Sequence, residues 1–177
     1  QAVKYKLIPT REIIDAFIEA SGGRMNYIMI APEELNDDYS IIDYICSKGI
    51  TVALGHTGAT FEMCEKAREH GARSFTHTFN GMSGLNHREP GVAGAALYFE
   101  DMYAELIGDG VHVNKVPAKI LARAKGKDKL ILVTDSVEIK GLPYGKVETR
   151  GKVVYICEDG VGRLENGTIS GSANRLN

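Results

Sequence analysis

Four polar side chains that can bind a metal ion or move a proton each follow a short apolar segment of the sequence. One such group would carry little information, because a lone histidine is more often a hydrogen-bonded structural residue than a ligand. Four in succession indicate a shared site, since neutral imidazole is a common metal ligand and a carboxylate can serve as a general base. These residues are His56, His77, His112 and Asp135.

The apolar, β-branched segments before these residues alternate with segments of helical periodicity. Thr60 is expected to cap one of the helices, and Gly71 to follow its end. Strands that recur at the length of one βα unit favour a parallel sheet with crossover helices, whose carboxyl ends lie at one edge. We predict strands at 26–30, 50–54, 73–76, 103–107 and 130–133, and helices at 38–47, 60–70 and 115–124.

The predicted fold class is α/β, with five βα units that form part of a (β/α)₈ TIM-type barrel. Five units exceed half of such a barrel, but 177 residues are fewer than the roughly 250 that a whole barrel typically needs. The chain could therefore be a complete, smaller doubly wound domain or a portion of a longer barrel enzyme. It starts at Gln1 without a methionine and stops at Asn177 without an evident terminal element, which favours the portion.

The sequence pattern changes after residue 140, where a turn-rich stretch leads into short β-branched segments. Asp-Gly at 159–160 and Asn-Gly at 166–167 are dipeptides typical of hairpin turns. We expect residues 1–140 to form the partial (β/α) barrel, which is the catalytic domain. Residues 141–177 are expected to form a small antiparallel β layer, part of a small β domain that returns toward the barrel.

Composition argues against several classes of partner. The net charge of −2 and the lack of a Lys/Arg stripe argue against nucleic-acid binding. No apolar run approaches the roughly 20 residues that span a bilayer, and no signal peptide is visible, so no membrane partner is expected. The cysteines at 46, 64 and 157 are odd in number and widely spaced, so we expect reduced structural thiols in a cytoplasmic protein.

Two histidines from adjacent strands, with carboxylate groups nearby, suit a divalent metal ion that keeps an open position for water. Zinc is the preferred ion, with iron, manganese or cobalt as alternatives. Such an ion would lower the pKa of its water to about 7 and polarise a carbonyl, so amide or ester hydrolysis is the expected reaction. Asp135 would take the proton from water and pass it to the leaving amine. Asp109 is interpreted only as the turn residue of an Asp-Gly pair.

Six motifs, in this order and at these spacings, make the sequence resemble a known enzyme family. They are GHTGAT, THTFNGM, HREPGVAGA, IGDGVHV, LVTDS and NGTISGS, and the resemblance runs from about Ala31 to Ser172. The family is the N-acetylglucosamine-6-phosphate deacetylases of the amidohydrolase superfamily, and the sequence resembles a part of them. Each motif alone is weakly specific, whereas six in register are strongly so.

The resemblance implies a reaction, a partner and a role for each matching residue. The reaction is metal-dependent hydrolysis of the acetamide of N-acetyl-D-glucosamine 6-phosphate to glucosamine 6-phosphate and acetate, a step of amino-sugar catabolism. The expected assembly is a homodimer. By this resemblance the metal ligands are His56 and His77, and the catalytic residue is Asp135. Arg88 reaches the phosphate of the substrate that is bound in the neighbouring subunit. The other substrate-binding residues are Asn80, Gly81, His112, Ile169, Ser170 and Gly171.

The sequence also departs from the family pattern. An HxEGPF-like stretch, which carries a glutamate metal ligand in the family, is absent from the 177 residues, so metal affinity is expected to fall and the chain could be a catalytically inactive piece. Gly81 stands where alanine is more usual, and Ser136 where alanine is common.

Two other functions stay open at this point. One is another metal-dependent amidohydrolase, such as a dihydroorotase-like or amino-acid deacetylating enzyme. The other is a binding domain that keeps the pocket without a metal. Arg88 favours the phosphosugar enzyme over the other amidohydrolases, because a guanidinium can engage phosphate oxygens through two parallel hydrogen bonds. Metal analysis would separate the binding domain from both kinds of enzyme.

Overall fold

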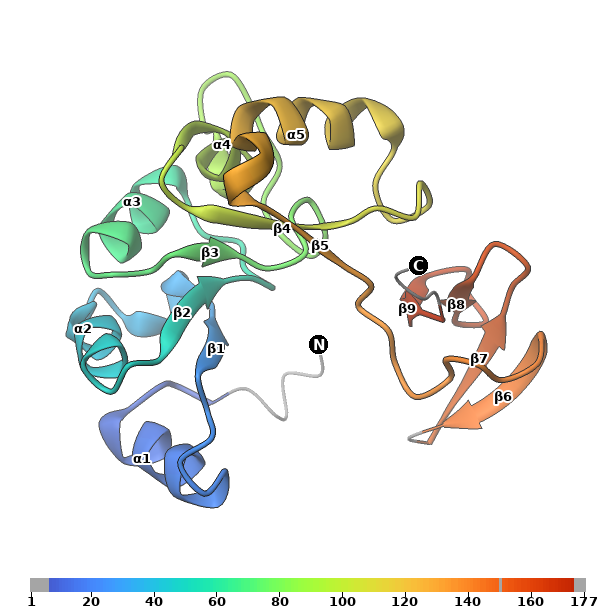
Figure 1. Cartoon of the computed structure of the whole chain (residues 1–177), viewed down its shortest axis with the longest axis horizontal. Coiled ribbons are helices and arrows are strands. Elements are labelled where there is room, and N and C mark those ends of the chain that lie inside the picture. Colours follow the sequence, from blue (N-terminus) through green and yellow to red (C-terminus); the bar gives the residue numbers. More distant parts are fainter. Residues whose placement is uncertain (1–6, 150, 174–177) are drawn as a thin grey trace.

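The computed structural model describes residues 7–149 and 151–173 of the chain (Figure 1). Helices and strands alternate in its first part, and strands alone make up its last part. In chain order the elements are α1 (Arg11–Ala20), β1 (Tyr27–Ile30), the 3₁₀ helix η2 (Pro32–Leu35), α2 (Ser40–Ser47), β2 (Thr51–Leu54), α3 (Phe61–Glu69), β3 (Ser74–Phe75), α4 (Gly91–Tyr98), β4 (Tyr103–Ile107), α5 (Lys115–Lys129), β5 (Leu130–Val133), β6 (Gly145–Thr149), β7 (Lys152–Ile156), β8 (Val161–Arg163) and β9 (Ile169–Ser172).

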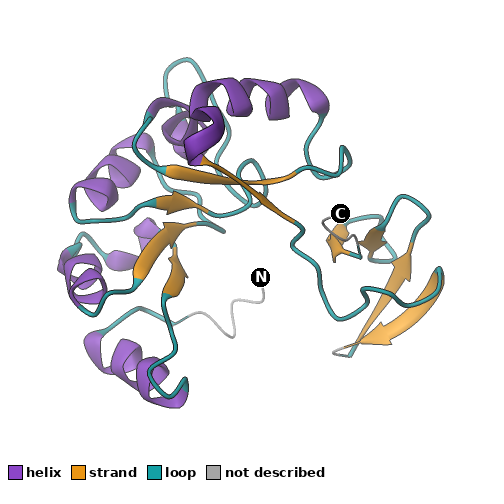
Figure 2. Cartoon of the chain, in the orientation of Figure 1, coloured by secondary structure: helices purple, strands orange, loops and turns teal. Residues whose placement is uncertain are grey.

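The first five strands form one parallel sheet in the order β1-β2-β3-β4-β5, so each strand pairs with the next one along the chain. The helices lie along the outer face of this curved sheet (Figure 2). The last four strands form a separate antiparallel sheet in the order β6-β7-β8-β9. The predicted α/β class, with parallel strands, crossover helices and an appended antiparallel β layer, is confirmed.

The element bounds agree with the sequence pattern closely at most positions. β4 and β5 have the predicted bounds, and the other predicted strands and helices differ by a few residues at their ends. Thr60 caps α3 as predicted, because its hydroxyl accepts a hydrogen bond from the Met63 amide at 3.3 Å. α5 is longer than predicted, although its helical dihedral angles are interrupted at Gly126.

Helices α1, η2 and α4 and strand β6 lie outside the predicted elements. α4 has the sequence GVAGAALY, and its first six residues are all buried. Because it is apolar on every side, it lacks the amphipathic period by which surface helices are identified. α1 is amphipathic and is capped by Thr10, whose hydroxyl accepts from the Ile13 amide at 3.4 Å.

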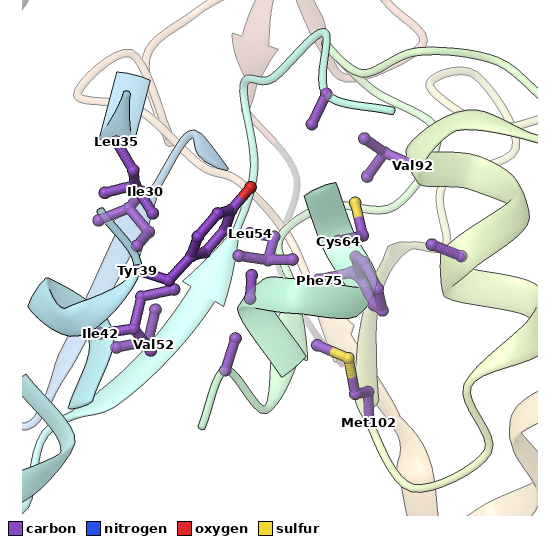
Figure 3. Packing of buried hydrophobic residues seen from close by; sticks show 14 of the residues in the cluster. Ile30, Leu35, Tyr39, Ile42, Val52, Leu54, Cys64, Phe75, Val92 and Met102 are labelled. Atoms are coloured by element: carbon purple, nitrogen blue, oxygen red, sulfur yellow. The ribbon is translucent and has the colours of Figure 1, made fainter. Parts of the chain in front are cut away.

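The main hydrophobic core lies between the parallel sheet and its helices (Figure 3). Val52 and Leu54 of β2 and Phe75 of β3 are fully buried there. Ile42 of α2 and Met102, just before β4, are equally buried and belong to the same cluster. Burial of this apolar surface fixes β2 and β3, whose carboxyl ends lead into the first two residues of the predicted site.

The three cysteines are free thiols in the described structure. Burial raises the pKa of Cys64 to about 12, so this thiol stays protonated at neutral pH. Among the described residues, none of the helices has the length and apolar character needed to cross a bilayer.

Lys125 of α5 is a buried cation that holds the segment between α4 and β4. Its ammonium donates hydrogen bonds to the carbonyl oxygens of Phe99 at 2.5 Å and Met102 at 2.9 Å. The residue is 5% exposed, and this burial lowers the pKa of Lys125 to about 8. The neutral amine can still donate to both carbonyls, so the contacts do not depend on the charge.

We expect Lys125 to make stability rise with pH. Its pKa of about 8 in the folded chain lies below the ordinary value of 10.5, so the unfolded chain binds more protons between these values and the free energy of unfolding increases across this window. Between about pH 8 and pH 10, wild type should gain about 2 kcal/mol relative to Lys125→Met, as measured by urea unfolding.

Lys119→Met provides the control, because Lys119 is exposed on the same helix. Its unfolding free energy should follow that of wild type at each pH. Parallel curves for wild type and Lys125→Met would contradict the assignment of this pH dependence to Lys125.

Candidate active site

His56 and His77 come after neighbouring strands whose register brings their carboxyl ends together. Leu54 of β2 pairs with Phe75 of β3, and each histidine stands two residues beyond its strand. The imidazole centroids are 4.6 Å apart, and the ring planes are nearly perpendicular at 86°. The two rings are thus close enough to face a common small ligand.

Backbone hydrogen bonds tie together the two loops that carry these histidines. The Thr57 amide donates to the Gly81 carbonyl at 2.9 Å, and the Ser83 amide donates to the Thr57 carbonyl at 3.1 Å. Glu33 also holds the first loop, since its carboxylate accepts from the Thr57 hydroxyl and, at 2.7 Å, from the Gly58 amide. The loops therefore act as one unit that supports the histidines.

His56, His77 and Asp135 share an uncommon backbone conformation. Their φ angles are 47°, 32° and 50°, in the left-handed region that residues with side chains seldom adopt. Such positions cost on the order of 1–3 kcal/mol each and cluster at functional sites, where surrounding contacts enforce them. Three strand-end residues with this conformation support their assignment to one site.

The two imidazoles have different surroundings. His77 is 6% exposed, and its Nδ1 is buried without a hydrogen-bond partner among the described residues. His56 is exposed, yet partial burial and then the neighbouring His77 lower the pKa of His56, while Asp135 acts in the opposite direction. A lowered pKa favours the neutral imidazole, which is the form that binds metals.

Glu105 is a site residue that the sequence interpretation missed. Its carboxylate accepts from the Tyr27 hydroxyl at 2.7 Å and from the His77 backbone amide at 3.1 Å. It thereby links β1 and β4, which are not neighbours in the sheet, to the loop of His77. The one signal in the sequence was a carboxylate in the otherwise apolar strand YAELI.

The antiparallel sheet is joined to the segment that carries Asp135. The Ser172 amide of β9 donates to the Asp135 carbonyl at 3.1 Å, and the Val137 amide donates to the Ser172 carbonyl at 3.1 Å. Gly171 packs against Val137 in this connection. The predicted substrate segment Ile169–Gly171 therefore lies beside the predicted catalytic aspartate.

Of three further predicted residues, Gly81 and Asn80 lie beside the two histidines, whereas Arg88 does not. Gly81 lies against His56, because a Cβ there would be 3.0 Å from the imidazole Nδ1. Asn80 is turned back toward its own loop, with its side-chain amide 3.3 Å from the His77 carbonyl. Arg88 lies on the exposed loop between β3 and α4, and its guanidinium has no hydrogen-bond or ion-pair partner in the described part of the chain. The structure does not bring Arg88 into contact with the histidines.

The donor set fits part of a metal site. Two converging imidazoles, one with an orphaned buried nitrogen, are suitable ligands for a divalent ion, which takes at least three protein ligands in catalytic sites. No group of three His, Cys, Asp or Glu side chains suited to an ion occurs within residues 7–149 and 151–173.

Comparisons with known proteins point to one kind of enzyme. No protein-family model matches the chain. The N-acetylglucosamine-6-phosphate deacetylase of Lysinibacillus sphaericus is 37% identical over 172 residues, which are 97% of this chain and 44% of that protein. The N-acetylgalactosamine-6-phosphate deacetylase of Shewanella sp. (strain ANA-3) is 40% identical over 150 residues, which are 82% of this chain and 36% of that protein.

A solved structure gives the same result. The N-acetylglucosamine-6-phosphate deacetylase from Pasteurella multocida is similar with a TM-score of 0.85 at 32% identity, covering 98% of this chain and 45% of that one. The chain thus spans less than half the length of these relatives.

We expect Gly171→Ala to destabilise the chain more than Gly167→Ala. Both glycines have left-handed φ angles, 89° and 82°, so either alanine costs about 1–2 kcal/mol of backbone strain. Only at Gly171 would the new Cβ also press on Val137, at 2.8 Å, which adds about 1–3 kcal/mol. Urea unfolding of both variants measures the difference, and equal losses would argue against tight packing of β9 on the Asp135 segment.

Proposed function

Because the chain is homologous to the N-acetylglucosamine-6-phosphate deacetylases over less than half of their length, we propose that it forms part of an enzyme with this activity. The reaction is hydrolysis of the acetamide of N-acetyl-D-glucosamine 6-phosphate to glucosamine 6-phosphate and acetate. The observation that carries the proposal is the convergence of His56 and His77, with the carboxylate of Asp135 acting electrostatically on His56, since these residues match the site residues implied by the motifs.

His56 and His77 would hold a divalent metal ion, with zinc preferred and iron, manganese or cobalt as alternatives. When bound, such an ion supplies Lewis-acid polarisation of the acetamide carbonyl. Burial lowers the pKa of His56, which favours its neutral form, and the Nδ1 of His77 is buried without a hydrogen-bond partner among the described residues.

Asp135 is the proposed general base and acid. It would take a proton from the attacking water and return it to the amino group that leaves, so the carboxylate is regenerated in each cycle. Its backbone is fixed on one side by Ser172 of β9, which limits the positions of the carboxylate. Ile169, Ser170 and Gly171 would then border the sugar next to Asp135.

The other contacts to substrate belong to the same assignment. Asn80 and Gly81 would hold the sugar beside His56, and His112 would form a further polar contact. Arg88 would reach the phosphate of the sugar bound in a neighbouring subunit. Its guanidinium is exposed and lacks a described partner in its own chain, which agrees with this role. This role of Arg88 requires a second subunit, so we propose a homodimer. We also propose that the protein is located in the cytoplasm and that the parallel sheet is part of a (β/α)₈ barrel.

A second candidate substrate is N-acetylgalactosamine 6-phosphate. The identity of 40% to the Shewanella deacetylase over 150 residues favours it. The two substrates share the acetamide and the phosphate and differ only in the configuration of one hydroxyl group. The same residues would therefore serve both. Assays of both sugars with the full-length protein would decide between them, and activity on neither would refute the proposed function.

We expect Asp135→Asn in the full-length protein to lower turnover by about 10²–10⁴-fold, because the general base is lost while the shape of the side chain is kept. Metal content, measured by elemental analysis, should be unchanged. Asp128→Asn, at an exposed position in α5, should keep normal turnover. A variant of Asp135 with near-normal turnover would contradict the assignment.

Arg88→Ala should weaken the reaction with the phosphorylated sugar selectively. Charge-assisted hydrogen bonds are worth roughly 1.5–3 kcal/mol each, so kcat/KM should fall about tenfold or more. The slower reaction with unphosphorylated N-acetylglucosamine should be nearly unchanged, because that sugar gives the guanidinium no partner. Arg123→Ala, an exposed arginine of α5, is the control. Equal losses on both sugars would show instead that Arg88 supports the shape of its loop.

Mixed dimers test whether Arg88 acts across subunits. When an Arg88→Ala subunit pairs with an Asp135→Asn subunit, a shared site leaves one site of each mixed dimer with neither defect. Activity should then reappear on mixing. A self-contained subunit predicts no recovery.

A further inference from the structure

Asp109 and His112 form a closely paired unit just beyond β4. The His112 Nδ1 lies 2.6 Å from one carboxylate oxygen of Asp109, Oδ2. The other oxygen, Oδ1, accepts from the backbone amides of Val111 at 2.9 Å and His112 at 2.8 Å. The side chains of His112 and Asp109 are only 4% and 9% exposed.

The carboxylate in this unit is held in its ionised form. Burial raises the pKa of Asp109, but the hydrogen bonds from His112 and from the Val111 amide outweigh it, so the pKa lies below its ordinary value. An ionised carboxylate can only accept hydrogen bonds. The proton between the two side chains therefore belongs to Nδ1 of His112.

The other ring nitrogen of His112, Nε2, remains available to bind a ligand. The His112 Nε2 is buried and has no hydrogen-bond partner in the described part of the chain. A buried polar atom of this kind is costly unless a ligand satisfies it. It can accept a hydrogen bond from the sugar while the ring is neutral, and it can donate one when the ring is protonated.

We propose that Asp109 is a positioning residue, which fixes His112 in the Nδ1–H form and directs its Nε2 at the bound amino sugar. This inference rests on the proposed function for the identity of the ligand. Asp109 is thus more than the turn residue of an Asp-Gly pair. One oxygen shapes the turn after β4, and the other sets the protonation pattern of the ring.

The variant Asp109→Asn tests whether Oδ1 shapes the turn while Oδ2 sets the tautomer of His112. The Oδ1 position faces two backbone N–H donors, so the amide oxygen of asparagine must occupy it. The amide NH₂ then faces Nδ1 of His112 and donates to it. The ring must move its proton to Nε2, and the proposed site meets the sugar with the wrong tautomer while the turn is preserved.

The chain contains a matched control pair on its surface. The His70 Nδ1 lies 2.8 Å from Asp43 Oδ2, and the side chains are 39% and 57% exposed. Asp43→Asn makes the same chemical change outside the proposed site.

The experiment combines ¹⁵N NMR of the histidine rings with steady-state kinetics on the full-length protein. At about pH 9, where histidine is neutral, wild type and Asp43→Asn should carry the His112 proton on Nδ1, and Asp109→Asn should carry it on Nε2. For the phosphorylated sugar, kcat/KM of Asp109→Asn should fall about tenfold or more. That of Asp43→Asn should stay within about twofold of wild type, because exposed pairs contribute little.

An Nε2–H tautomer in wild type would overturn the inference without any variant. An unchanged tautomer in Asp109→Asn would do the same, and so would a reversed tautomer with unchanged kcat/KM. Absence of deacetylase activity in wild type would overturn the proposed function instead, while the NMR measurement would still report whether Asp109 sets the tautomer of His112.

Discussion

The in-register pairing of β2 with β3 is the constraint on which the candidate site depends. Two parallel strands that end side by side place the residues after them within reach of each other, and here these residues are His56 and His77. The buried core between the sheet and its helices fixes the strands, and backbone hydrogen bonds fix the two loops that leave them. A shift of one strand by one residue would separate the imidazoles.

The antiparallel sheet is joined to the segment that carries Asp135, the predicted catalytic residue, from a distant part of the sequence. Ser172 forms a parallel bridge with Ser136, and its backbone hydrogen bonds to Asp135 and Val137 set β9 beside the Asp135 segment. Strands β2 and β3 lead into the two histidines and β5 leads into Asp135, while β9 holds the backbone of the Asp135 segment. Motifs far apart in the sequence thus lie on segments that backbone hydrogen bonds connect.

The order and type of most elements could be predicted from hydrophobic periodicity. The convergence of the strand ends could be predicted from the parallel topology that the βα spacing implies. Helix α4 escaped prediction because its uniformly apolar sequence has no period. The contact of Glu105 with the His77 amide and that of Asp109 Oδ2 with His112 were not predicted. Both depend on loop conformations, which neither periodicity nor spacing encodes.

The left-handed backbone at His56, His77 and Asp135 sets stability against function in this part of the molecule. Glycine at any of these positions would relax the backbone, whereas the side chain that the proposed chemistry requires keeps it under strain. Selection for greater thermal stability would therefore favour residues that the proposed reaction cannot use. Stabilised relatives of this chain should have gained their stability elsewhere, in the core and the outer helices, and left these strand ends strained.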